Sequence, residues 1–181
     1  SSAPTGILEC DNLSQNESRA VVFHSLSKRS NLAGLRSGFV AANEKIISKL
    51  ELYRTYHGVT LSVPTQEASE WAWKDDDHVQ KNRLEYDLKY QVAKECLDSS
   101  IEIERPNGGF YYWLKLPCND ENFVKTLYQK ESVLTLPGTY LSKEEKGINP
   151  GKGYVRLAVV HDADTIERAF TAINRTLMDF Q

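Results

Sequence analysis

The sequence predicts an α/β protein in two parts, with a change of pattern near residue 58. Before that position, two short apolar runs, residues 20–23 and 37–42, flank a turn-rich segment of serines, glycines and basic residues. From Ile101 onward, extended and helical patterns follow in the order strand, strand, helix, strand, strand, helix. This order is typical of a small α+β sandwich, in which helices cover one side of a sheet.

Composition limits the class of protein and of binding partner. Hydrophobic residues make up 40% of the 181 residues and charged residues 26%, with a net charge of −3, values typical of a soluble globular protein. No segment is rich in Lys and Arg without matching Asp and Glu, so we expect no nucleic-acid partner. No apolar run approaches the roughly 20 residues that cross a bilayer, so we expect no membrane partner.

The cysteines indicate a compartment and argue against a metal. Cys10, Cys96 and Cys118 are widely separated, form no CxxC pair and lie beside no histidine-rich cluster. A metal site is therefore not expected. A sparse, odd number of cysteines suits a reducing compartment, so we expect a cytoplasmic protein.

The first part of the chain predicts two strands and a helix. Residues 1–19 are polar and are expected to be mostly loop. The continuous apolar runs at 20–23 and 37–42 predict fully buried strands. Two strands are too few for a sheet of their own, so we expect them to pair with strands that this chain does not contain. Asn43 is the expected N-cap of a helix that ends before a connector at 54–60.

Two further helices are expected before residue 100. Pro64 suits the first turn of one helix, and residues 75–77, three aspartates, can cap the next. That second helix carries apolar residues at four-residue spacing, which predicts a continuous apolar stripe: Leu84, Leu88, Val92 and Cys96.

The last part of the chain predicts a sheet and two helices. Ile101–Ile103 is expected to be a strand, and residues 110–116 alternate between apolar and mixed positions, as in a half-buried strand. Asn119 or Asp120 is expected to cap a helix. Further strands are expected at 132–136 and 154–160. A closing helix, begun by Asp162 or Asp164, carries one apolar face: Ile166, Phe170, Ile173 and Leu177.

The turn-rich segment at residues 23–39 combines groups that suit a phosphorylated aldehyde. The hydroxyls of Ser25 and Ser27 and the fixed charge of Arg36 suit an anion such as a phosphate monoester. Lys28, held among them, can form an imine with an aldehyde. The alternative is a solvated loop lysine, because lysines are rarely buried.

This segment resembles the pyridoxal-phosphate attachment motif of the class I/II aminotransferases, the fold type I enzymes. The matching residues are Ser25-Leu26-Ser27-Lys28, followed by Gly34-Leu35-Arg36-Ser37-Gly38. The resemblance implies pyridoxal 5′-phosphate as cofactor and Lys28 as the attachment lysine and acid/base. It also implies that Ser25, Ser27 and Arg36 contact the cofactor, with Ser25 and Arg36 on its phosphate.

The resemblance also implies a fold and an assembly. Residues 1–58 would be the last strands of the large cofactor-binding domain, and residues 59–181 the connecting helices and the small C-terminal domain. The full-length protein is expected to be a homodimer. The resemblance covers nearly the whole chain but only the C-terminal half of the family's length, so we expect a fragment that is inactive alone.

Two further arginines are candidates for substrate binding. Arg156 stands inside an apolar strand, where an unpaired charge would be costly. The resemblance makes it the arginine that grips the substrate α-carboxylate, although a strand arginine is more often a surface charge. Arg54 is a candidate for a distal carboxylate, with a helix-terminal cation that complements the dipole as the equal alternative.

Within the family, residues 23–30 and 53–58 are most similar to the succinyldiaminopimelate transaminases. This resemblance implies amino transfer between glutamate and a 2-oxo acid, N-succinyl-2-amino-6-oxopimelate, in lysine and diaminopimelate biosynthesis. Three alternatives stay open. They are an aspartate, alanine or aromatic aminotransferase, a non-catalytic aminotransferase-like effector domain of a regulator, and a purely structural fragment that dimerises.

Overall fold

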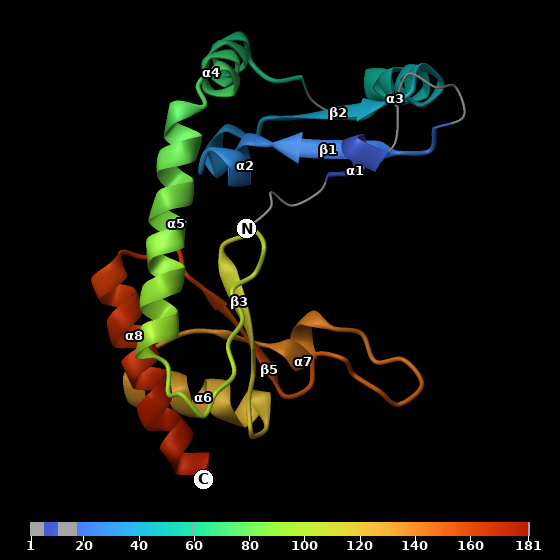
Figure 1. Ribbon diagram of the computed structural model, residues 1–181. Helices are drawn as coiled ribbons and strands as arrows, with labels where there is room; N and C mark the ends of the chain where they lie inside the picture. The colour runs from blue at the N-terminus through green and yellow to red at the C-terminus, as the bar shows by residue number, and fades with distance from the viewer. Residues whose placement is uncertain (1–5, 11–17, 59, 181) are drawn as a thin grey trace. The chain divides into compact units, whose positions relative to one another are not determined.

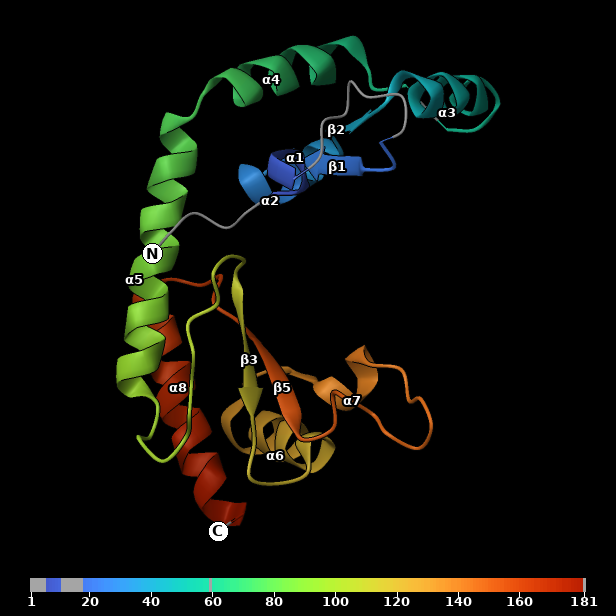
Figure 2. The same cartoon turned by 45° about the vertical axis from the view of Figure 1, so that its right-hand side comes forward.

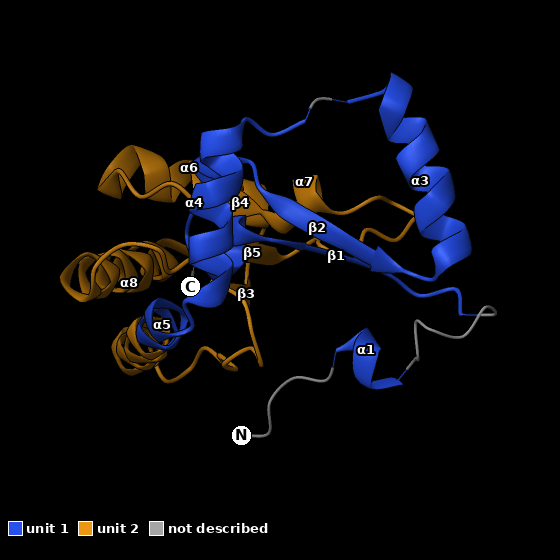
Figure 3. Cartoon of the chain, turned by 90° about the horizontal axis from the view of Figure 1, so that it is seen from above, with its two compact units in different colours: residues 1–83 blue, residues 84–181 orange. Residues whose placement is uncertain are grey.

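The computed structural model describes residues 6–10, 18–58 and 60–180. The chain has the expected α/β fold and divides into two compact units, residues 1–83 and residues 84–181 (Figure 3). The long helix α5 (Asp77–Cys96) contains the point of division.

Unit 1 contains a two-stranded antiparallel sheet, and the turn-rich segment connects its strands. Strands β1 (Val21–Ser25) and β2 (Gly38–Ala42) pair from Val21 opposite Ala42 to Ser25 opposite Gly38 (Figure 1). The one-turn helix α2 (Leu26–Arg29) and the short 3-10 helix η1 (Ala33–Leu35) lie between the strands in sequence. A short helix α1 (Ile7–Cys10) precedes them.

The expectation that these two strands are buried is wrong for this chain. Phe23 is 76% exposed, and Val21 and Phe39 are also exposed. Within the described residues of unit 1, β1 and β2 form a sheet of two strands. A two-stranded sheet has two unpaired edges and too few neighbours to cover both faces, so its apolar side chains remain in contact with solvent.

Three helices follow, and each begins near the residues that the sequence indicates. Asn43 caps α3 (Glu44–Tyr56), its Oδ1 accepting from the Ile46 amide at 3.0 Å. Helix α4 (Val63–Lys74) has Pro64 in its first turn, as expected. Asp75 precedes α5, and its Oδ1 accepts from the Asp77 amide at 2.9 Å. Helix α3 continues through Arg54, so the expected connector begins later than residue 54.

The apolar stripe expected on α5 is only partly buried. Leu84 is 68% exposed and Leu88 50% exposed, whereas Tyr90, Ala93 and Leu97 are buried. A spacing of four residues exceeds the 3.6 residues of a helical turn, so a row of such residues drifts around the helix. A step of three residues keeps Tyr90 and Ala93 on one face, and the buried Leu97 directly follows the end of the helix.

Unit 2 is built on a three-stranded antiparallel sheet in the order β3-β5-β4. Its strands are β3 (Tyr111–Lys115), β4 (Leu136–Pro137) and β5 (Tyr154–Ala158). The period-two pattern is confirmed, since Tyr112 and Leu114 are buried between exposed neighbours. Residues 101–103 are not a strand, and β4 is shorter than the expected strand at 132–136. Ile101 and Ile103 instead pack against the core as irregular backbone.

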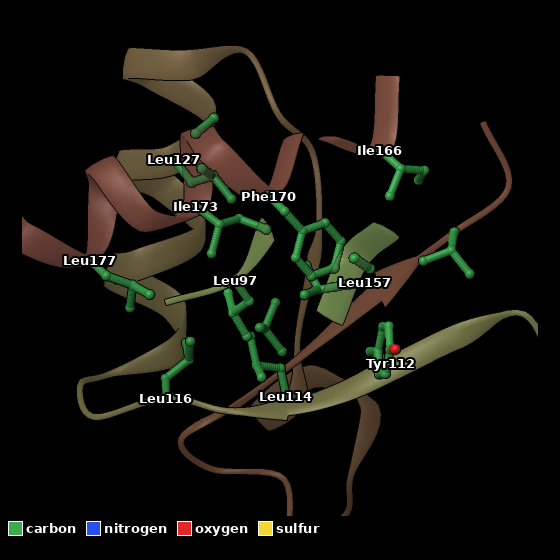
Figure 4. Packing of buried hydrophobic residues seen from close by; sticks show 14 of the residues in the cluster. Leu97, Tyr112, Leu114, Leu116, Leu127, Leu157, Ile166, Phe170, Ile173 and Leu177 are labelled. Carbon is green, nitrogen blue, oxygen red and sulfur yellow. The ribbon is translucent and has the colours of Figure 1, made fainter. Parts of the chain in front are cut away.

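Two helices cover one face of this sheet and close the core. Helices α6 (Asp120–Glu131) and α8 (Ala163–Leu177) contribute Leu127, Phe170 and Ile173, which point toward β3 in Figure 4. Asp162 is the N-cap of α8, and the apolar face expected on this helix is buried. A one-turn helix α7 (Gly138–Leu141) and a 3-10 turn η2 (Met178–Phe180) complete the unit.

A buried carboxylate holds three segments of unit 2 together. Asp120 is completely buried and accepts hydrogen bonds from the Thr139 amide at 2.8 Å, the Thr139 hydroxyl at 3.0 Å and the Gly153 amide at 3.1 Å. Burial raises the pKa of this carboxyl, but the hydrogen bonds together outweigh burial and place the pKa below its ordinary value. Asn119, not Asp120, caps α6.

No helix in the described ranges is long and apolar enough to cross a membrane.

Replacing Asp120 with Asn is expected to lower the free energy of unfolding by about 2 kcal/mol, because an amide nitrogen would face backbone donors that lose their acceptor. Urea unfolding followed by circular dichroism measures the change. Asp164→Asn, the same chemical change at an exposed carboxylate in the first turn of α8, is the control and should shift stability by less than about 0.5 kcal/mol. Equal effects of the two substitutions would contradict the role given to Asp120.

Candidate cofactor and substrate sites

The first site is formed where β1 ends and α2 begins. Ser25 is both the last residue of β1 and the N-cap of α2, in extended conformation (φ −146°), and its hydroxyl makes no capping hydrogen bond. Leu26 is completely buried, and its amide donates to the Ser37 carbonyl at 3.1 Å. The buried leucine and this hydrogen bond fix the point at which the backbone leaves the sheet.

Gly38 permits the close approach of the two strands at this point. A Cβ placed on Gly38 would lie 2.5 Å from the His24 carbonyl oxygen and 3.0 Å from the Ser25 Cβ. Both distances are at or below the limit of real contacts, and the first involves backbone that cannot move without breaking the pairing. The glycine therefore keeps Ser25 in register at the end of the sheet.

Arg36 is held in an unusual backbone conformation beside this junction. It terminates η1 in the left-handed region, at φ 53° and ψ 33°. Its amide donates to the Ala33 carbonyl at 3.3 Å, and its Nη1 donates to the same oxygen at 2.9 Å. Left-handed conformation is uncommon for a residue other than glycine, and such outliers cluster at functional sites.

The structure brings four of the predicted residues onto one short segment. Ser25, Ser27 and Lys28 lie within four consecutive residues at the end of β1, and Arg36 lies two residues before β2. Figures 1 and 2 show α2 at the junction of the two strands. Ser27 is partly buried, whereas Lys28 and Arg36 are exposed. The segment therefore presents two hydroxyls, an amine and a guanidinium near the end of the sheet.

The sequence did not single out Arg29, whose side chain makes several contacts within unit 1. Its side chain is only 12% exposed. It donates to the carbonyls of Ala72 and Trp73, pairs with Asp76 and lies over the Trp73 ring, 5.1 Å from the centroid. The signal in the sequence is weak: Arg29 follows the buried Leu26 by three residues, the spacing of one helix face.

The second site lies on the face of the unit 2 sheet opposite the core. Arg156 is on the central strand β5, between two core residues, and pairs with Trp113 on β3 and Leu136 on β4. Its guanidinium lies over the Tyr111 ring, 5.4 Å from the centroid. Burial of Arg156 is only partial, so this charge faces outward and is not enclosed in the core.

Three aromatic residues, Tyr111, Trp113 and Tyr154, lie on the same face of the sheet as Arg156. Trp113 and Tyr154 stack with their rings 5.7 Å apart and 13° from parallel. Tyr111 is the ring that lies against the guanidinium, and this contact suits an arginine that binds a planar carboxylate.

Arg54, the third predicted arginine, lies in the last turn of α3. It is exposed, and a Cβ on Gly58 would meet its Nη1 at 3.0 Å. Tyr53 and His57, its neighbours, stack with their rings 4.6 Å apart. Lys28 and Arg54 belong to unit 1 and Arg156 to unit 2.

Comparison with known proteins gives one family. The family "Aminotransferase class I and II" matches residues 3–173. The LL-diaminopimelate aminotransferase of Natranaerobius thermophilus is 34% identical over 85% of this chain and 39% of its own length. The chain thus spans about two fifths of the length of this curated relative.

Solved structures agree with the family match. An aminotransferase from Neisseria meningitidis is 40% identical, with a TM-score of 0.80 over 89% of this chain and 40% of its own. A protein from Thermus thermophilus described as a probable N-succinyldiaminopimelate aminotransferase is 27% identical, with a TM-score of 0.76 over 87% of this chain and 42% of its own. Pyridoxal phosphate is the cofactor of this family, as the motif around Lys28 implies. The chain belongs to the class I and II aminotransferases.

Proposed function

We propose that this chain supplies the cofactor lysine and the substrate-binding arginine of a transaminase, which moves an amino group between glutamate and a 2-oxo acid. The observation that carries the proposal is the segment from Ser25 to Arg36. It places a lysine, two serine hydroxyls and an arginine where a two-stranded ladder ends. Family membership supports the same reading.

The side chains of this segment fit pyridoxal 5′-phosphate by their chemistry. The Ser25 hydroxyl makes no capping hydrogen bond to α2, and Nη1 of Arg36 donates to the Ala33 carbonyl. The Ser25 hydroxyl and the other guanidinium N–H groups of Arg36 can therefore bind an anion. Hydroxyls and guanidinium groups are the donors that bind phosphate in proteins. A primary amine on the same segment suits an aldehyde.

Each residue then has a role of its own. Ser25 and Arg36 would hold the phosphate, and Ser27 would also contact the cofactor. Lys28 would provide the amine for the aldehyde and the acid/base for the proton at the substrate Cα. The bound cofactor supplies an electron-withdrawing ring. Arg156 binds the substrate α-carboxylate with its planar guanidinium, oriented by Tyr111.

We extend the proposal to the organisation of the protein. Residues 1–58 would be the end of the large cofactor domain, and residues 59–181 the connecting helices and small domain. The exposed apolar side chains of β1 and β2 support this, because an interior sheet of a larger domain would bury them. The protein would act in the cytoplasm as a homodimer.

The substrate we propose is N-succinyl-2-amino-6-oxopimelate, with glutamate as the amino donor. The description of the Thermus relative supports a succinylated substrate, whereas that of the Natranaerobius relative names LL-diaminopimelate. Arg54, exposed at the end of α3, would bind the distal carboxylate of the longer substrate. An aspartate, alanine or aromatic amino acid is the alternative substrate.

Replacing Lys28 with Ala is expected to abolish the visible absorbance band that lysine-bound pyridoxal phosphate gives when the cofactor is added to the chain, because the amine that binds the aldehyde is gone. A spectrophotometric titration measures the band. The matched control is Lys45→Ala, an exposed lysine at the start of α3, which should leave the band unchanged. A band of equal strength in both variants would disprove the attachment site.

The two substrate arginines are expected to differ in what they recognise. In the full-length protein loaded with cofactor, Arg156→Lys should lower kcat/KM about ten- to hundredfold for every amino acid, because bidentate carboxylate binding is lost. Arg54→Ala should lower kcat/KM about tenfold for the succinylated substrate and leave glutamate unchanged.

Steady-state rates with both substrates make this comparison. Arg168→Lys, an exposed arginine on α8, is the control. Full activity of Arg156→Lys would contradict the carboxylate role, and equal losses for both substrates in Arg54→Ala would contradict the distal role.

A further inference from the structure

We propose that Arg29 is a positioning residue, which fixes the turn that carries Lys28 against the C-terminal end of α4. The role of Lys28 itself rests on the proposed function, whereas the contacts of Arg29 are independent of it. No cofactor or substrate atom is required to touch Arg29.

The turn that carries Lys28 needs support from outside. Helix α2 has four residues, far fewer than the roughly 12 that a helix needs to persist alone. The amides of Ser30 and Leu32, which follow the helix, both donate to the Leu26 carbonyl, at 3.0 and 3.2 Å. Tertiary contacts must therefore hold it, and those contacts lie on the side of Leu26, Arg29 and Ser30.

Arg29 supplies such contacts by donating hydrogen bonds to carbonyls at the C-terminal end of α4. The last carbonyls of a helix have no partner within it. At the end of α4, the Trp71 carbonyl accepts from the Asp75 amide at 3.1 Å. Arg29 donates to the next two carbonyls, Nη1 to Ala72 at 2.8 Å and Nη2 to Trp73 at 3.4 Å. A cation at this end also complements the helix dipole.

Two further contacts orient the guanidinium. Nη2 of Arg29 lies 2.5 Å from Oδ1 of Asp76, and the guanidinium carbon lies over the Trp73 ring, 5.1 Å from its centroid. The Trp73 ring in turn contacts the rings of His24 on β1 and Phe39 on β2, at 5.3 and 5.1 Å. The residue after Lys28 is therefore tied to both strands whose ends form the proposed cofactor site.

Only an arginine can make this set of contacts. The planar guanidinium donates to two carbonyls and a carboxylate at once while stacking on an indole, whereas an ammonium cannot stack in this way. Because Lys28 and Arg29 are adjacent, movement of the guanidinium would move the backbone that carries the lysine amine. Small displacements of this kind are costly at reacting groups.

The test compares Arg29→Ala and Arg29→Lys with wild type in the full chain. Hydrogen exchange of the Ser30 and Leu32 amides is expected to accelerate about tenfold in both variants, because the turn opens more easily. Pyridoxal-phosphate binding, titrated by its visible absorbance, is expected to weaken by about tenfold as well. Exchange of the Val159 amide in unit 2, which donates to the Phe110 carbonyl, should not change.

The control is Lys74→Ala. Lys74 is also a cation at the C-terminal end of α4, but it pairs with Glu70. Its removal should alter neither measurement. Unchanged exchange at Ser30 and Leu32 in Arg29→Ala would overturn the proposal. Faster exchange with unchanged cofactor binding, or full recovery in Arg29→Lys, would overturn the positioning role. If wild type shows no Lys28-dependent binding, the proposed function fails, and exchange alone decides whether Arg29 holds the turn.

Discussion

The close pairing of Gly38 with Ser25 is the constraint on which the candidate cofactor site depends. With no side chain on Gly38, β2 can lie directly against the end of β1, and Leu26 can enter the core while its amide bonds to Ser37. The backbone must then turn at once, which brings Ser25, Ser27 and Lys28 to the sheet end. Arg36, which itself has left-handed backbone conformation, lies two residues before β2 at the same end of the sheet. A larger residue at position 38 would displace all of them.

The two units depend on different kinds of polar contact. In unit 1, a cation connects separate segments: the Arg29 guanidinium binds the last carbonyls of α4 and, we infer, fixes the turn that carries Lys28. In unit 2, an anion connects separate segments: the buried Asp120 carboxylate accepts hydrogen bonds from Thr139 and Gly153. Each charged group is enclosed by several hydrogen bonds, which is the condition under which burial of charge is tolerated. The β5 strand that presents Arg156 begins immediately after Gly153.

The sequence predicts most of this organisation because much of it is local. Asn43, Pro64 and Asp162 mark helix starts by hydrogen bonding or backbone geometry within a few residues, and alternation predicts the buried side of β3. Burial that depends on distant partners is not predictable in this way. Phe23 has the pattern of a buried strand yet is exposed, and Ile101–Ile103 has strand-forming residues but packs without pairing. Arg29 was missed because its partners, at 72–76, are far away in sequence.

Chemical trapping at Lys28 tests the central claim most directly. Borohydride reduction of the chain mixed with pyridoxal phosphate, followed by peptide mass spectrometry, locates each lysine that has bound the aldehyde. We predict that Lys28 carries the label at about tenfold or more above other lysines, because neighbouring groups hold the phosphate in place. Labelling spread evenly over exposed lysines such as Lys45 and Lys49, without preference for Lys28, would contradict the account.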